Sequence, residues 1–224
     1  MVGRHPPKVQ ARVRIPAAVC FTMAKNIAEW TVVREYLRNF FHLTALLSLI
    51  AYEKVSEWFG GNRYGLLALL GGLVFFLIVD LLRVELRWRV KPLIWRLFIK
   101  EREANQFSSA LYFFASIIIC LAVFRKDIAY AAIFITAIGD VVAHEVSKRL
   151  HYFRFVKKRS VEGVFAGLAV NLIVGMFFLP LKVAIAMACV ASFVEAITEK
   201  VDDNFAVPLI AGFVGSLVAW ILGL

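Results

Sequence analysis

Long apolar stretches separated by short polar segments run along most of the chain. A helix needs roughly 20 mostly apolar residues to cross a bilayer, and stretches of about this length recur here. The pattern therefore predicts an all-α fold, a polytopic membrane helix bundle with about seven transmembrane helices. The predicted spans are Phe41–Trp58, Tyr64–Leu82, Ser108–Phe124, Ile128–Val146, Gly163–Leu179, Leu181–Thr198 and Phe205–Leu224.

The segments before and between these spans differ in character. Residues 1–34 are basic and contain several prolines, which predicts a cytoplasmic tail rather than a further span. Residues 83–107 are basic and aromatic, with Trp88 and Trp95, a pattern typical of an amphipathic helix at the membrane surface. Pro180 predicts a tight turn between the fifth and sixth spans. The first span is the least regular, because charged residues intrude on its second half.

The positive charge of the chain is concentrated in alternate connections. The chain is 61% hydrophobic, with a mean hydropathy of +0.77 and a formal net charge of +10. Most of its 26 Lys and Arg residues fall in the tail or in connections on the same side as the tail. The exceptions are Lys54, Arg63, Arg125, Lys126 and Lys182. Cytoplasmic loops carry such an excess, so we expect a cytoplasmic N-terminus and no nucleic-acid partner.

Polar residues gather near the predicted cytoplasmic ends of the spans. They are Glu35, Arg38, His42, Asp80, Arg83, Asp140, Glu145, Glu162, Glu195, Asp202, Asp203 and Asn204. Helix ends tolerate charge, and this explanation suffices for Lys148 and Arg149. It is weaker for Asp140, because apolar residues 141–143 follow it. An ionisable group beside lipid indicates a functional site.

The segment Ile138–Gly167 adds features of a phosphate site to this carboxylate. A basic run at 157–159 precedes Ser160, which we expect to cap a helix that begins near Val161. Backbone N–H groups at a helix N-terminus favour an anion. The glycines of the segment allow the backbone to approach either a ligand or a neighbouring helix closely. These glycines are Gly139, Gly163 and Gly167.

The combination indicates phosphoryl transfer, which needs carboxylates to hold Mg²⁺ on nucleotide phosphates and cations to neutralise them. Asp140 with Glu195 or Asp203 supplies the carboxylates. The sequence lacks both G-x-x-x-x-G-K-[ST] and H-E-x-x-H, which argues against a P-loop and a zinc protease site. Asp140 and His144 lie four residues apart on one helix face, either as metal ligands or as a plain hydrogen-bonded pair.

Several motifs occur together and in a fixed order. The strongest are Gly139-Asp140-x-x-Ala143, Lys158-Arg159-Ser160-Val161-Glu162-Gly163, Glu195-Ala196 and Asp202-Asp203-Asn204-Phe205-Ala206-Val207-Pro208-Leu209. Weaker ones are Glu35-x-x-Arg38-x-x-x-His42, Asp80-x-x-Arg83 and Glu103. Over roughly residues 35–215, the chain resembles the CTP-dependent membrane lipid kinases, a family that includes dolichol kinase, phytol kinase and the yeast-type diacylglycerol kinase. It looks most like prokaryotic or archaeal dolichol (polyprenol) kinase-like members.

The resemblance implies a single kinase domain over residues 35–224, with an interfacial helix near 83–107. It implies transfer of the CTP γ-phosphate to a membrane lipid alcohol at the cytoplasmic face, with Mg²⁺ or another divalent cation. Asp140, Glu195 and Asp203 would be catalytic, and Asp140 and Asp203 would hold the metal. The implied CTP and phosphate contacts are Gly139, Lys157, Lys158, Arg159, Ser160, Glu162, Gly163 and Asn204. The implied substrate and interface residues are Glu35, Arg38, His42, Asp80, Arg83 and Glu103.

Other functions stay open at this point. The acceptor could be dolichol or polyprenol, which we favour, or diacylglycerol, phytol or geranylgeraniol. A phosphatidate cytidylyltransferase-like enzyme also uses CTP, but its H-G-G-x-x-D-R-x-D signature does not occur here. A small transporter would distribute polar residues through the depth of the membrane, and a lipid-binding scaffold would need no acidic cluster. The sequence leaves open whether the chain is a monomer or a homodimer.

Overall fold

Helices make up most of the described structure, and one lies in each predicted span. The computed structural model describes residues 47–86, 108–150, 154–156, 159–198 and 201–224. Its first helix covers residues 47–59. The other elements are α2 (Asn62–Leu86), α4 (Ser109–Val123), α5 (Lys126–Arg149), β1 (Arg154–Val156), β2 (Arg159–Ser160), α6 (Val161–Phe178), α7 (Leu181–Ile197) and α8 (Asp203–Ile221). The two short strands form an antiparallel hairpin, in a segment where the sequence predicted only a loop.

Four of these helices are long and apolar enough to cross a membrane. They are Asn62–Leu82, Lys126–Arg149, Val161–Phe178 and Asp203–Ile221. Helix α4 is apolar, but its 15 residues span only about 22 Å, against a hydrocarbon layer of about 30 Å. The chain is therefore a helical membrane protein, as the sequence predicted. The full count of seven spans stays a prediction.

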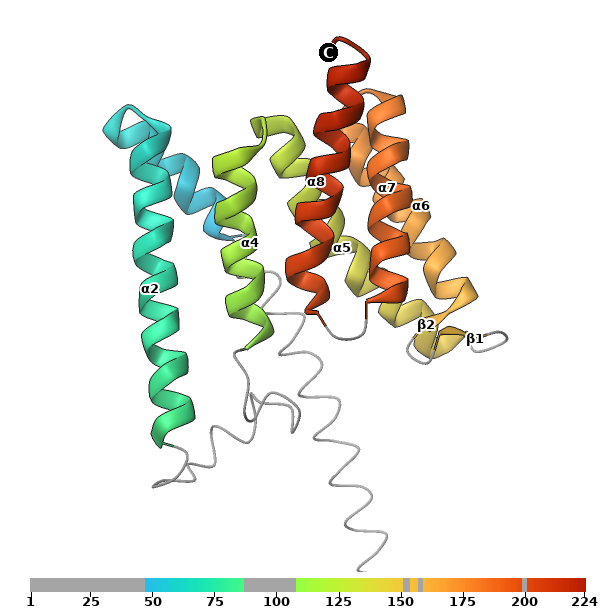
Figure 1. Ribbon diagram of the computed structural model, residues 1–224, viewed down its shortest axis with the longest axis horizontal. Coiled ribbons are helices and arrows are strands. Elements are labelled where there is room, and N and C mark those ends of the chain that lie inside the picture. The colour runs from blue at the N-terminus through green and yellow to red at the C-terminus, as the bar shows by residue number, and fades with distance from the viewer. Residues whose placement is uncertain (1–46, 87–107, 151–153, 157–158, 199–200) are drawn as a thin grey trace, which may run out of the picture.

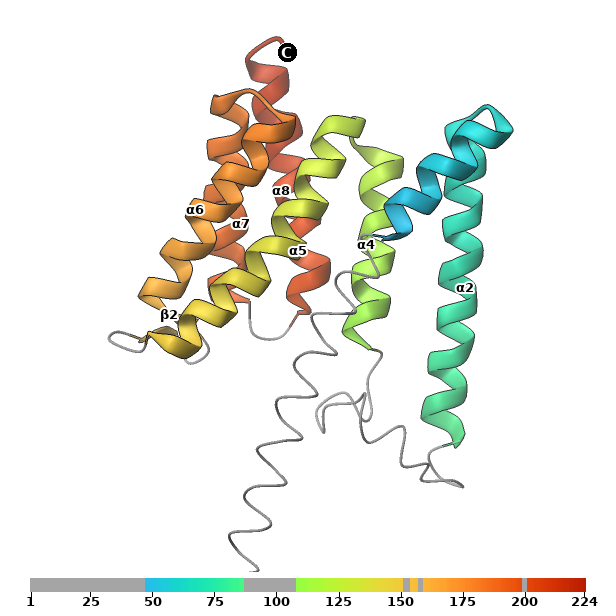
Figure 2. The same ribbon diagram turned by 180° about the vertical axis from the view of Figure 1, so that it is seen from behind.

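Successive helices run in alternating directions, so their ends collect at two levels (Figure 1 and, from behind, Figure 2). At the level of the β1–β2 hairpin, α2, α5 and α7 end while α4, α6 and α8 begin. We call this level the hairpin end. The opposite end carries the turn between α6 and α7 and the C-terminus. Pro180 forms that turn, as predicted, and its carbonyl accepts hydrogen bonds from the N–H groups of Val183 and Ala184.

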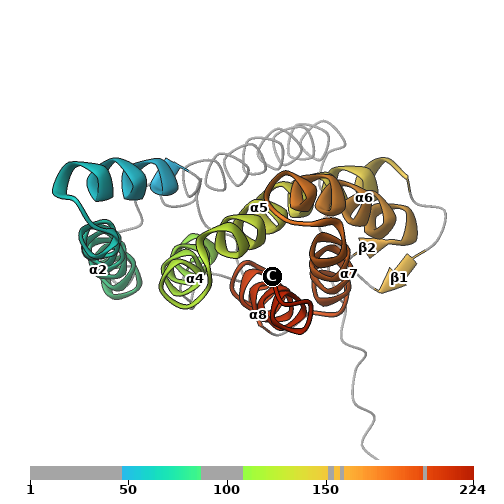
Figure 3. The ribbon, with the colours of Figure 1, turned by 90° about the horizontal axis from the view of Figure 1, so that it is seen from above.

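Helix α5 is the centre of the bundle. It packs against α4, α6, α7 and α8, and it crosses the bundle obliquely, as the view from above shows (Figure 3). Within its most apolar stretch 61% of the residues are buried, compared with 17% in α2. A position fixed on α5 is therefore held from several sides at once. Helix α2 lies at the edge of the bundle and contacts α4 (Figure 3).

Small residues let α5 and α6 approach closely. Gly139, Ala143 and Ser147 on α5 recur every four residues, and so do Gly163 and Gly167 on α6. A Cβ at Gly163 would lie 2.7 Å from the carbonyl oxygen of Ala143, and one at Gly167 would lie 2.9 Å from the Ala143 Cβ. Neither distance is tolerable for a real Cβ. Close helix approach through small residues is a common way to bind helices together in lipid.

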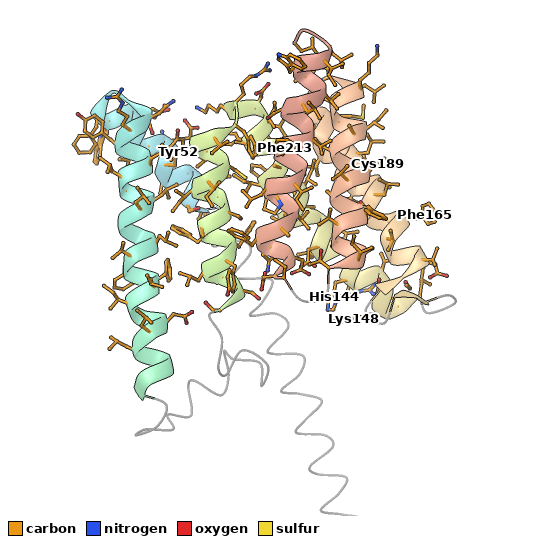
Figure 4. All side chains as sticks on the ribbon, in the orientation of Figure 1. Tyr52, His144, Lys148, Phe165, Cys189 and Phe213 are labelled. Atoms are coloured by element: carbon orange, nitrogen blue, oxygen red, sulfur yellow. The ribbon has the colours of Figure 1, made fainter. Side chains whose placement is uncertain are left out.

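The outer surface of the bundle is apolar. Large side chains such as Phe165 on α6 and Phe213 on α8 are exposed and point away from the bundle (Figure 4). On a water-soluble protein such a surface would drive association. Against lipid tails it carries no such penalty, since the tails are as apolar as the side chains.

Some predictions fall on parts of the chain that the structure does not describe. The tail 1–34 and most of the proposed surface helix near 83–107 lie outside the described residues. The backbone of α2 continues to Leu86, so the start of that second segment belongs to a helix that was expected to end at Leu82. The first predicted span is described only from residue 47 onward.

The close crossing of α5 and α6 gives a test of packing. Gly163→Ala should lower the free energy of unfolding by about 1–3 kcal/mol, because the new methyl group overlaps Ser147 and the Ala143 backbone. Thermal unfolding in detergent, followed by circular dichroism, measures the change. Gly71→Ala is the matched control, since a Cβ there meets no heavy atom within 4 Å. Equal unfolding midpoints for the two variants would contradict this account of the crossing.

Candidate functional site

Buried polar residues concentrate toward the hairpin end of the bundle. Among the described residues, the buried charged side chains are Asp80, Asp140 and Glu195, with 7%, 5% and 9% of their surface exposed. Each lies in the half of its helix nearer the hairpin end. Charged groups are rarely buried without a role in pairing or function, particularly in a membrane protein. This end of the bundle is therefore the candidate site.

The start of α6 follows the sequence prediction closely. Ser160 is the N-cap, and its hydroxyl accepts a hydrogen bond of 3.1 Å from the N–H of Gly163. The N–H of Ser160 in turn donates to the hydroxyl of Ser147 on α5, at 3.4 Å. Ser160 is buried, so this cap joins the two helices as well as ending one of them. Glu162 lies in the first turn of α6, where a negative charge is favourable.

A small hollow opens between α5, α6 and α7 beside Glu195. It is lined by Ala143, Val164, Gly167, Ser192, Glu195 and Ala196. The hollow is large enough for about one water molecule. Glu195 lines it from α7, and Ala143, which lines it from α5, is less than one helical turn from Asp140 in the sequence.

Asn171 joins the same three helices one turn deeper in the bundle. Its Nδ2 donates a hydrogen bond of 3.0 Å to the hydroxyl of Ser192 on α7. Its amide group also lies against Gly139 on α5, because a Cβ at Gly139 would be 2.9 Å from the Asn171 Cγ. Only 1% of Asn171 is exposed, and its Oδ1 has no hydrogen-bond partner within the described part of the chain. Gly139 precedes Asp140 directly, and Ser192 lies one turn before Glu195.

The first turn of α8 is tied to α4. Asp202 is the N-cap of α8, and its carboxylate accepts from the N–H of Asn204 at 3.0 Å. The same carboxylate accepts from the hydroxyl of Ser109 at 2.7 Å. On the other side of α4, Asp80 accepts a hydrogen bond of 2.7 Å from the N–H of Ser108. The beginning of α4 is thus anchored to both α2 and α8.

The structure brings many of the predicted site residues to one end of the bundle. Asp140, Ser160, Glu162, Glu195, Asp203 and Asn204 lie there, on α5, α6, α7 and α8. His144 and Lys148 follow Asp140 along α5 toward this end (Figure 4). Asp80 reaches the same end, but its visible contact is with the start of α4. Glu35, Arg38, His42, Glu103, Lys157 and Lys158 lie outside the described residues, and of Arg83 and Arg159 only the backbone is described.

The glycines of the motif are explained by helix packing. Gly139 leaves room for the Asn171 amide, and Gly163 leaves room for Ser147 and the Ala143 carbonyl. Of the two partners that the sequence allowed, a ligand or a neighbouring helix, the structure supplies the helix. Their assignment as CTP or phosphate contacts has no support from this geometry.

The donor groups present suit a cation that is shared with a substrate. No three His, Cys, Asp or Glu side chains come together as a metal cage anywhere in the described ranges. Mg²⁺ does not need such a cage, because it is held by one or two carboxylates together with substrate phosphates and water. A pair of buried carboxylates such as Asp140 and Glu195 matches that demand, and half-buried Asp203 at the start of α8 adds a third candidate.

Comparison with protein-family models, with curated proteins and with solved structures gives no match. The chemistry of this end of the bundle is therefore argued from its own residues.

Sequence reasoning overlooked the uncharged polar residues within the spans. Ser116, Asn171 and Ser192 are all buried, and each makes a hydrogen bond to another helix. A signal was available for Asn171, because an amide in the middle of an apolar helix is costly unless it is paired. Nothing in the sequence reveals which helix supplies the partner.

The pairing of Asn171 with Ser192 gives a second test. Ser192→Ala should lower the free energy of unfolding by about 1–3 kcal/mol, because it leaves the buried amide of Asn171 without its acceptor. The double variant with Asn171→Leu should recover most of that loss, since no buried donor then remains. Unfolding in detergent measures both changes. A double variant as unstable as Ser192→Ala alone would argue against the bond.

Proposed function

We propose that the protein is a CTP-dependent kinase that phosphorylates the hydroxyl group of a membrane lipid, with a dolichol- or polyprenol-type alcohol as the favoured acceptor. The observation that carries the proposal is the set of buried carboxylates near one end of the bundle, beside a capped helix start that follows a basic segment. The motifs in the sequence resemble those of CTP-dependent lipid kinases, and this resemblance supports CTP as the phosphoryl donor and a lipid alcohol as the acceptor. We also propose that the hairpin end faces the cytoplasm and that all seven predicted spans cross the membrane.

The position of the site suits a substrate that comes from the bilayer. A lipid alcohol keeps its hydroxyl near the membrane surface while its chain stays among lipid tails. The hairpin end offers carboxylates at the ends of apolar helices, which is the depth at which such a hydroxyl meets a water-soluble nucleotide. In the sequence, the basic run 157–159 directly precedes the Ser160 cap, and we propose that it binds the nucleotide phosphates.

The reaction is a direct transfer. The hydroxyl oxygen of the lipid attacks the γ-phosphorus of CTP, the bond to the bridging oxygen of the β-phosphate breaks, and CDP leaves. The proton of the hydroxyl passes to a carboxylate, for which Asp140 and Glu195 are the buried candidates. Bound Mg²⁺ would supply positive charge to the β- and γ-phosphates. Burial keeps the carboxylates in fixed positions, which matters because this chemistry depends mainly on positioning and electrostatics.

The opposite end of the bundle gives little support for a transporter. Its charges pair with each other at the surface, as in Glu53 with Lys126 at 2.7 Å and Arg125 with Asp127 at 2.6 Å. Among the described residues, no charged side chain is buried in that half of the bundle. A transport pathway would need polar groups on both sides of a central site.

The decisive assay is phosphate transfer by the purified protein in detergent or nanodiscs. CTP labelled at the γ-phosphate, Mg²⁺ and a panel of acceptors should yield CDP and a lipid monophosphate. The panel contains a polyprenol, dolichol, phytol, geranylgeraniol and diacylglycerol. Formation of a CDP-lipid and pyrophosphate would establish the cytidylyltransferase alternative instead. Binding of CTP without turnover on any acceptor would favour a scaffold.

Asp140→Asn tests the central carboxylate. The variant should lose about 100-fold or more in kcat, because the amide can neither take up a proton nor offer a full negative charge. Glu145→Gln is the matched control on the same helix, since Glu145 is partly exposed and pairs with Arg149 at 2.7 Å. It should keep near-normal turnover. Near-normal turnover of Asp140→Asn would remove Asp140 from the catalytic set.

A further inference from the structure

Pro208 interrupts the hydrogen bonding of α8 next to the candidate site. In an α-helix the N–H of each residue donates to the carbonyl four residues earlier, and the partner of residue 208 is Asn204. Proline has no N–H, and its ring also pushes against that carbonyl. The carbonyl of Asn204 therefore lacks its ordinary helical donor. Pro208 and Asn204 are both buried, so water is a poor substitute.

Ser116 on α4 supplies a donor to this carbonyl. Its hydroxyl lies 3.0 Å from the Asn204 oxygen, and the side chain is fully buried, with 0% of its surface exposed. The hydroxyl also lies 2.7 Å from the carbonyl of Phe113 in its own helix. A single hydroxyl proton serves one acceptor at a time. The Phe113 carbonyl keeps its i+4 donor within α4, whereas the Asn204 carbonyl has lost its i+4 donor in α8.

The bond from Ser116 acts on the turn that carries two of the predicted site residues. Asp203 and Asn204 form the first turn of α8, and Asp202 before them is held by Ser109 at 2.7 Å. This turn is thus attached to α4 at two points, by Ser109 at the start of α4 and by Ser116 about two turns further along α4. The Oδ1 of Asn204 is buried and has no hydrogen-bond partner in the described part of the chain, so it is available to a donor from a ligand.

We infer that Ser116 is a positioning residue: its hydroxyl replaces the helical donor lost at Pro208 and thereby fixes Asp203 and Asn204 for the nucleotide. The inference deepens the proposed function and rests on it where catalysis is concerned. The hydrogen bond itself does not depend on that function, and it can be measured separately.

The bond is tested by a double-mutant cycle. Ser116→Ala should lower the unfolding midpoint in detergent when Pro208 is present. Pro208→Ala restores an N–H that can donate to the Asn204 carbonyl, so adding Ser116→Ala in that background should have much less effect. Equal effects of Ser116→Ala in the two backgrounds would overturn the inference.

Hydrogen exchange shows where the bond acts. The N–H groups of Phe205 and Ala206 donate to the Asp202 carbonyl at 3.1 Å, and Ser116→Ala should speed their exchange relative to amides of α7. Thr136→Val is the matched control, because the buried Thr136 hydroxyl bonds to the Ala132 carbonyl of its own helix at 2.8 Å and to no other helix in the described part of the chain. It should leave the exchange at 205 and 206 unchanged. Unchanged exchange in Ser116→Ala would also overturn the inference.

Kinetics tests the positioning role. Ser116→Ala should lower kcat/KM for CTP by about three- to tenfold, which is the weight of one hydrogen bond, while the KM for the lipid stays near normal. Thr136→Val should keep both values, and Pro208→Ala should restore most of the loss in the double variant. A wild-type kcat/KM for Ser116→Ala, despite altered exchange, would overturn the positioning role. A wild-type protein that transfers no phosphate would refute the proposed function. The double-mutant cycle and the hydrogen exchange would still show whether Ser116 supplies the donor to the Asn204 carbonyl.

Discussion

The contact on which this bundle depends is the close crossing of α5 and α6. Without side chains at Gly163 and Gly167, the two helices approach until backbone and small side chains touch. Lipid tails give apolar helices little reason to associate, so this kind of close packing has to supply much of the attraction. The crossing sets the position of Asp140 on one helix and of the Ser160 cap on the other, and it leaves the gap into which Asn171 fits.

Hydrogen bonds between side chains and neighbouring helices fix the alignment of the packed helices. Asn171 with Ser192 joins α6 to α7, and Ser116 with Asn204 joins α4 to α8. Each involves a polar group that would be costly to leave unpaired in an apolar interior. These bonds therefore fix register as well as contact: each side chain meets its partner in only one vertical alignment of the two helices. Carboxylates on neighbouring helices are then kept at matching depths.

The sequence predicted local features well and contacts poorly, for a physical reason. Spans follow from apolar length, the start of α6 from the capping chemistry of Ser160, and the turn at Pro180 from its fixed backbone angle. The position of Asp140 beside other polar helix ends followed from alternating direction alone. The partners of Gly139, Asn171 and Ser116 could not be predicted. The sequence of a helix shows which face carries small or polar residues, but it does not show which other helix packs against that face. The oblique path of α5 could not be predicted for the same reason, because it depends on which helices α5 packs against.

The short length of α4 has a consequence for the surrounding bilayer. Its 15 residues cover about 22 Å, and residues such as Val123 are exposed at its surface. Lipids beside it meet a hydrophobic width several ångströms below that of a resting bilayer, and bilayers respond to such a mismatch by thinning locally. We expect such thinning to draw the headgroup layer inward next to Ser109 and Asp202. Under the proposed function a lipid headgroup has to arrive at this place, so the thinned membrane would itself form part of the entrance to the site.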